Sequence, residues 1–185
     1  MLDFAGIRVL VLGDAMLDRF LYGDVDRISP EAPVPVVRLR SSHAMPGGAG
    51  NVARNVSALG GKAVLAGLLG EDEAAAELRA LLAADPGIED ATVASAARRS
   101  IRKMRVIAGN QQVARLDEEE ARPADAAEAA ALVEAALCAR PGVHSVSSAE
   151  LADSSVVAAV RVVRGRARTW SIASRRRWRT CITAS

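Results

Sequence analysis

One run of small residues constrains the fold of this chain more than any other feature. Residues 46–50 read Pro-Gly-Gly-Ala-Gly and are followed by Asn51. Glycine has no Cβ, so the backbone here can adopt positive φ angles and approach a bound polar molecule closely. From Asn51 the pattern becomes helical, because Val52 and Val56 share one face and Gly60 stands where a C-cap belongs. We therefore predict a tight loop leading into a helix N-terminus, whose free N–H groups suit hydroxyls or an anion.

The glycine-rich run alone leaves two interpretations open. No Gly-Lys-Ser/Thr ending follows it, which excludes a P-loop. The run is then either a ligand-binding loop or a turn that lets a helix pack closely on a strand.

The surrounding sequence predicts an α/β fold. Residues 7–12 form a short apolar run that ends at Gly13, as expected for a buried strand of a parallel sheet. Asp14 and Asp18 come just after this strand, at the edge where open α/β sheets bind ligands. The other predicted elements are strands at 34–40 and 62–69, helices at 49–59, 73–84 and 124–138, and short strands at 92–93, 103–107 and 112–116.

Four segments resemble a known family in their order and spacing. They are Gly-Asp-Ala-Met-Leu-Asp at 13–18, Arg-Ile-Ser-Pro-Glu-Ala-Pro-Val-Pro-Val-Val at 27–37, the glycine-rich run with Gly60 and Gly70, and Asn-Gln-Gln-Val-Ala-Arg-Leu-Asp at 110–117. Together they resemble the ribokinase-like (PfkB) carbohydrate kinases, and within them the heptose 7-phosphate kinase branch. The resemblance implies that residues 1–137 are the N-terminal part of a ribokinase-like three-layer α/β sandwich. It also implies a small β lid, with strands at about 20–40 and 90–117.

The resemblance implies an ATP-dependent kinase that phosphorylates the anomeric hydroxyl of D-glycero-β-D-manno-heptose 7-phosphate, for ADP-heptose and lipopolysaccharide precursor synthesis. The residues that match the family's sugar-binding positions are Asp14, Asp18, Gly47, Gly48 and Asn51. For the two aspartates, the alternative is a helix-start or turn role.

Three cationic residues are candidates for the 7-phosphate, because a sugar phosphate needs cationic partners. They are Lys103, Arg105 and Arg115. A solvated strand face, or ion pairs with Asp117, Glu118 or Glu119, is the alternative for each of them.

After about Leu137 the resemblance stops, and residues 138–185 form an Arg-rich tail. Residues 151–185 hold eight arginines and one acid, Asp153. The family's Gly-Ala-Gly-Asp loop, which carries its catalytic base, does not occur, so we assign no catalytic residue. ATP and Mg²⁺ are implied by the family, but their binding residues are not present in this chain. Our hypothesis is a truncated kinase whose tail comes from a shifted reading frame.

Three alternatives remain open. The chain is a non-catalytic fragment that binds sugar phosphate, or its sugar differs from that of the heptose branch. A genuine basic tail with Trp170 and Trp178 would contact nucleic acid through phosphates and stacking, but we do not expect this partner, because the tail has no recognisable binding fold.

Composition excludes other classes of protein. No apolar stretch approaches the length that crosses a bilayer, and no signal peptide is recognisable, so we expect a cytoplasmic protein without a membrane partner. Two cysteines are too few for a disulfide framework, and His43 and His144 stand alone, so no metal site is predicted. The family also implies a homodimer formed through the lid.

Overall fold

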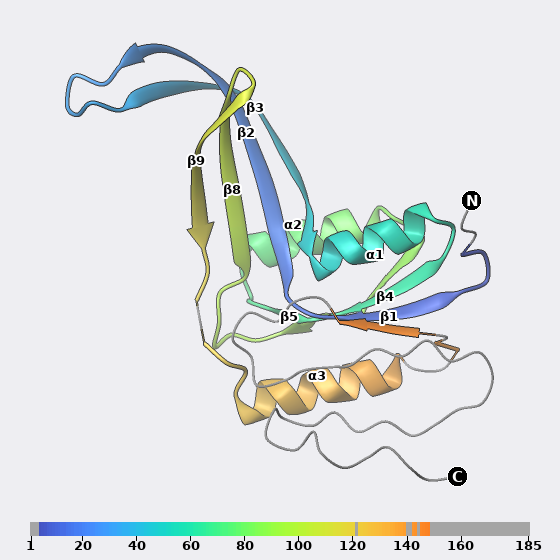
Figure 1. Ribbon diagram of the computed structural model, residues 1–185. Coiled ribbons are helices and arrows are strands. Elements are labelled where there is room, and N and C mark those ends of the chain that lie inside the picture. The colour runs from blue at the N-terminus through green and yellow to red at the C-terminus, as the bar shows by residue number, and fades with distance from the viewer. Residues whose placement is uncertain (1–3, 121, 140–141, 144, 149–185) are drawn as a thin grey trace, which may run out of the picture.

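A parallel sheet covered by helices on both faces forms the body of the protein (Figure 1). The computed structural model describes residues 4–120, 122–139, 142–143 and 145–148. Its main sheet has the order β10-β1-β4-β6, and all neighbouring strands are parallel. These strands are β1 (Arg8–Leu12), β4 (Lys62–Ala66), β6 (Ile88–Asp90) and β10 (Ser145–Ser148).

Helices α1 (Ala49–Ala58) and α2 (Glu73–Ala83) cover one face, and α3 (Ala126–Cys138) covers the other (Figure 1). Alternate residues of each strand point to opposite faces of a sheet. Val11 and Leu65 accordingly pack with the α1 and α2 side, whereas Leu12 and Val64 pack with α3. All four are at most 1% exposed, so both faces of β1 and β4 lie in the core. The predicted three-layer α/β architecture is confirmed.

Local capping signals fix where the helices begin. The Asp72 side chain accepts a hydrogen bond from the Ala75 N–H at 2.9 Å and is the N-cap of α2. Asp125 and Glu128 form a capping box at the start of α3. Among the described helices, none is long and apolar enough to cross a membrane.

The lid is a second sheet that projects from the body (Figure 1). Its order is β3-β2-β8-β9, with β2–β3 and β8–β9 antiparallel and β2–β8 parallel. Gly109, at φ 58°, lies in the turn between β8 and β9. The four strands are β2 (Ala15–Ile28), β3 (Pro35–Gly48), β8 (Ile101–Ala108) and β9 (Gln111–Glu118). A small two-stranded sheet pairs β5 (Leu68–Leu69) with β7 (Val93–Ala94).

The lid strands are longer than predicted, and their length rules out one of the two roles considered for Asp18. Strand β2 already begins at Ala15, so Asp18 lies inside a strand and its helix-start or turn role is wrong. Strand β3 runs on to Gly48, directly against the start of α1.

Other elements also differ from the sequence predictions. The predicted strand at 62–69 is split at Gly67, where an added Cβ would lie 2.6 Å from the Gly13 carbonyl oxygen. Strand β6 was not predicted. Strand β10 was not predicted either, because its sequence Ser-Val-Ser-Ser contains a single apolar residue. His144 and the tail from residue 149, with the hypothesis of a shifted frame, lie outside the described residues.

Candidate functional site

The site is built where the lid strands leave the body. Ala49, the first residue of α1, donates its N–H to the Asp14 carbonyl oxygen at 2.9 Å. Gly48 precedes it with φ 55° and ψ −125°, and a Cβ there would lie 2.4 Å from the same oxygen. Both the positive φ and this close approach require glycine. In place of the predicted loop, β3 therefore passes directly into α1 at Gly48, against the backbone that follows β1.

The Asp18 carboxylate lies against the backbone of Gly47. A Cβ on Gly47 would come within 2.4 Å of Asp18 Oδ2 and 2.9 Å of Met16 Cγ. Glycine at this position thus leaves room for a carboxylate beside the junction of β3 and α1. Asp14, Asp18, Gly47 and Gly48, four of the residues singled out from the sequence, come together here.

Asp18 also reaches across the lid to Arg105. Arg105 Nη1 donates to Asp18 Oδ1 at 2.7 Å, and the two side chains are 25% and 17% exposed. The guanidinium carbon of Arg105 also lies 5.2 Å from the centroid of the Phe20 ring, a cation–π distance. Strand register explains this, since Phe20 of β2 stands beside Arg105 of β8. Arg105 is held between a carboxylate and an aromatic face.

The other two candidate cations lie on the same face of the lid. Lys103 is in register with both Asp18 and Asp117, and Arg105 is in register with Arg115. Residues in register on neighbouring strands project to the same side. Asp18, Lys103, Arg105 and Arg115 therefore form one strip, which we call the lid strip.

Acidic side chains partner the outer cations of the lid strip. Lys103 Nζ lies 3.2 Å from Glu119 Oε2 and 3.7 Å from Asp117 Oδ2. Arg115 Nε donates to Asp117 Oδ1 at 3.0 Å. The ion pairs that sequence analysis left open as an alternative therefore occur at Lys103 and Arg115. A phosphate at these cations would compete with Asp117, whose side chain is 22% exposed.

Asn51 is a predicted site residue that lies outside the lid strip. It lies exposed in the first turn of α1, three residues after Gly48. Within the described part of the chain, no hydrogen bond joins its side chain to Asp18. Phe20, in contrast, projects to the same face as the lid strip but was not singled out from the sequence. Its spacing of two residues from Asp18 would have placed it on the same face, had β2 been predicted from Ala15.

Across the described ranges, no three or more His, Cys, Asp or Glu side chains gather into a group that would hold a metal ion. The Mg²⁺ implied by the resemblance therefore has no fitting site among them.

Comparison with known proteins identifies the family. The profile described as pfkB family carbohydrate kinase matches residues 7–164. This chain belongs to the pfkB family of carbohydrate kinases.

Two relatives with which this chain shares sequence are longer proteins. The chain is 59% identical over 124 residues to the bifunctional protein HldE of Caulobacter vibrioides, covering 67% of this chain and 26% of that protein. It is 47% identical over 164 residues to the bifunctional protein HldE of Azorhizobium caulinodans, covering 85% and 34% respectively. The chain thus spans about a quarter to a third of the length of these relatives.

Solved structures share the pfkB-family fold seen here. Phosphofructokinase-2 from Escherichia coli in complex with fructose-6-phosphate aligns with a TM-score of 0.52 at 25% identity, over 69% of this chain and 40% of that one. A possible 1-phosphofructokinase from Thermotoga maritima aligns with a TM-score of 0.56 at 17% identity, over 76% and 44%. The ribokinase-like fold predicted from the motifs is confirmed.

Proposed function

We propose that residues 1–137 form the sugar-phosphate-binding part of a heptose 7-phosphate kinase, with D-glycero-β-D-manno-heptose 7-phosphate as substrate. The observation that carries the proposal is the contact set of Asp18, which lies over Gly47 and is held by Arg105 at 2.7 Å. A carboxylate fixed in this way can accept hydrogen bonds from two sugar hydroxyls. The glycines let the sugar approach the backbone closely.

The lid strip supplies the charge that a phosphorylated sugar needs. Arg105, Lys103 and Arg115 place three cations beside Asp18 on one face. Guanidinium groups bind phosphate oxygens through paired hydrogen bonds, and an ammonium adds a point charge. Phosphate binding at Lys103 and Arg115 would replace their contacts with Asp117. We propose that this exchange selects a sugar phosphate over the free sugar.

The family makes the reaction a phosphoryl transfer to a carbohydrate. The phosphoryl donor, the metal ion and the acceptor hydroxyl are proposals. We propose ATP as phosphoryl donor, used with Mg²⁺, and the anomeric hydroxyl as acceptor. A general base must remove the hydroxyl proton, and cationic or N–H groups must stabilise the transferred phosphoryl group. We assign neither role to a described residue. Because ATP is the donor, we place the reaction in the cytoplasm.

The test compares heptose 7-phosphate with the same heptose lacking the phosphate, by titration calorimetry on the full chain. We expect the phosphorylated sugar to bind at least about tenfold more tightly, equivalent to about 1.4 kcal/mol. Equal affinity for the two sugars would contradict the role of the lid strip. ADP release in the presence of the heptose phosphate then separates a working kinase from a fragment that only binds.

We also propose that two copies pair through their lids. The support is a group of exposed apolar side chains on β2, β3 and the segment between them, namely Val25, Ile28, Val34 and Leu39, exposed by 41%, 61%, 50% and 56%. Sedimentation equilibrium would show a dimer, and Leu39→Ser would shift it toward the monomer.

A further inference from the structure

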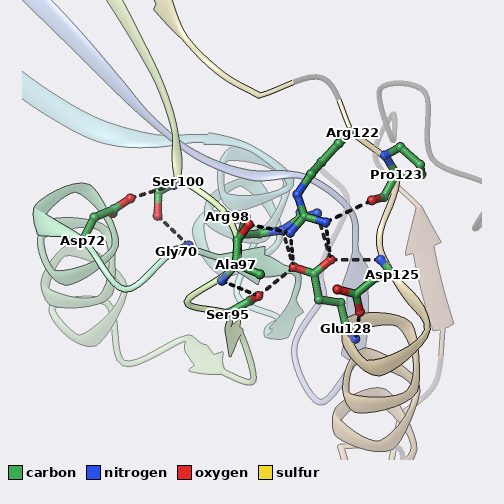
Figure 2. A network of polar contacts seen from close by, with 10 residues as sticks. All are labelled: Gly70, Asp72, Ser95, Ala97, Arg98, Ser100, Arg122, Pro123, Asp125 and Glu128. Atoms are coloured by element: carbon green, nitrogen blue, oxygen red, sulfur yellow. Dashed lines mark hydrogen bonds and ion pairs between the residues drawn. The ribbon is translucent and has the colours of Figure 1, made fainter.

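One buried carboxylate outside the lid strip gathers an unusual number of donors (Figure 2). Glu128, in the first turn of α3, has a side chain that is only 4% exposed. It accepts hydrogen bonds from Ser95 Oγ at 2.7 Å, Arg98 Nε at 2.9 Å and Arg122 Nη2 at 2.7 Å. The Asp125 N–H donates to it as well, at 3.0 Å.

The donors come from both ends of the β8–β9 hairpin. Ser95 and Arg98 lie in the segment that leads into β8, and Arg122 lies in the segment that leaves β9. Arg122 Nη2 also donates to the Ala97 carbonyl oxygen at 2.9 Å, which joins the two segments directly. A single side chain on α3 therefore fastens both ends of the hairpin that carries the three cations of the lid strip.

The charge on Glu128 is stable near neutral pH. Burial opposes its ionisation, but the hydrogen bonds from Ser95, Asp125, Arg98 and Arg122 outweigh burial and lower the pKa of this carboxyl from 4.5 to about 2. Two guanidinium groups then face a full negative charge, so these contacts are charge-assisted and stronger than neutral hydrogen bonds.

A second carboxylate fixes the same segment from the α2 side (Figure 2). Asp72 Oδ2 accepts the N–H of Ser100 at 2.8 Å, one residue before β8 begins. Ser100 Oγ in turn accepts the N–H of Gly70 at 2.9 Å. Residues 95–100 are thus tied to α3 and to α2 just before the chain enters the lid.

We propose that Glu128 is a positioning residue, which sets where the β8–β9 hairpin lies against β2 and thereby aligns Arg105 with Asp18. The consequence for phosphate binding rests on the proposed function; the anchoring of the hairpin does not. Glu128→Gln keeps the shape of the side chain and removes the charge that holds Arg98 and Arg122.

Hydrogen exchange on the full chain tests the anchoring without any ligand. In Glu128→Gln, the amides of β8 and β9 are expected to exchange at least about tenfold faster, while those of β1 and β4 stay within about twofold. The matched control is Glu134→Gln, the same change at an exposed position of the same helix, which is expected to alter neither group. A purely structural role would accelerate all four strands together, and that result, or no change in β8 and β9, would overturn the proposal.

Two milder variants keep the test decisive if Glu128→Gln does not fold. Arg98→Gln is expected to accelerate exchange mainly at the start of β8, and Arg122→Gln mainly at the end of β9. Uniform acceleration in either variant would overturn the anchoring. In titrations, Glu128→Gln is expected to bind heptose 7-phosphate about tenfold more weakly while its affinity for the unphosphorylated heptose changes less. If the wild-type chain binds neither sugar, the proposed function fails, and hydrogen exchange still decides the anchoring.

Discussion

A methyl group at Gly47 provides a sharp test of how the Asp18 carboxylate is held. In Gly47→Ala, the new Cβ would lie 2.4 Å from Asp18 Oδ2 and 2.7 Å from its Cγ. Real Cβ atoms essentially never approach another heavy atom more closely than 3.0 Å, so the carboxylate or the strand must move by roughly 0.6 Å. Asp18 is short and already bound to Arg105 at 2.7 Å, so this movement strains that contact.

The expected cost follows from the contact that is strained. A hydrogen bond between charged groups contributes about 1.5–3 kcal/mol, and overpacking of a tight site costs about 1–3 kcal/mol. We therefore expect Gly47→Ala to lower the free energy of unfolding by about 1–3 kcal/mol. We also expect it to weaken heptose 7-phosphate binding by about tenfold or more.

Urea unfolding and titration calorimetry measure the two effects. The matched control is Ser41→Thr, which adds one methyl group at an exposed position of the same strand. It is expected to leave both quantities within experimental error. If Gly47→Ala bound the sugar phosphate as tightly as the wild-type chain, the reasoning that places the sugar at Asp18 and this loop would be refuted.

Acid, core and charge perturbations give further tests. The Glu128 carboxyl has a pKa of about 2 in the folded protein, against 4.5 ordinarily. Above pH 4.5 it therefore adds on the order of 3 kcal/mol to the free energy of unfolding, and this contribution is lost as the pH falls toward 2. Urea unfolding at about pH 5 and about pH 3 should show Glu128→Gln losing less stability on acidification than the wild-type chain; an equal loss would count against this carboxyl. Leu82→Ala truncates a fully buried side chain of α2 and should lower the free energy of unfolding by about 2–5 kcal/mol. The control Leu137→Ala changes a side chain that is 48% exposed and should lower it by less than about 1 kcal/mol. Similar losses in the two variants would contradict the assignment of Leu82 to the core. Arg105→Gln should weaken heptose 7-phosphate binding about tenfold, whereas Arg102→Gln, on the opposite face of β8, should change it less than about twofold; a reversed order would place the phosphate elsewhere.

Local signals account for the parts of the fold that were predicted correctly. The strand β1 is buried on both faces, so its sequence is a continuous apolar run. Such a run can be predicted as a strand without knowledge of the strands beside it. Asp72 caps α2 by accepting a hydrogen bond from the N–H of a residue only three positions later, and α1 begins within the glycine-rich run. Each of these features depends on residues that are close in sequence, so a single sequence is enough to predict them.

The lid depends on contacts that a single sequence does not reveal. Along β2, Leu17 packs into the core and Arg19 pairs with Glu77 of α2, while Asp18 points to the other face. Neither face of this strand is uniformly apolar, so the alternation that marks a strand is weak. Arg105 reaches Asp18 from 87 residues away, and no local pattern encodes that pairing.

The burial of Glu128 and its contacts were not predicted, for a related reason. An acidic residue in an Ala-rich helix is ordinarily expected to face solvent, because burial of a carboxylate is costly unless it is paired. Its partners Ser95 and Arg98 lie 33 and 30 residues earlier in the chain, and only the fold brings them together. The polar character of residues 95–100 gave no sign of this contact.

The central claim is that Asp18 binds the sugar of a phosphorylated heptose, and titration of Asp18→Asn with heptose 7-phosphate tests it most directly. Asp24→Asn serves as the matched control, since Asp24 lies farther out on the same strand and pairs with Arg40 instead. Loss of a charged acceptor for two hydroxyls should weaken binding by about 2–3 kcal/mol, or roughly 30- to 150-fold, in Asp18→Asn, with Asp24→Asn close to the wild-type chain. Equal affinity of Asp18→Asn and the wild-type chain would contradict the account.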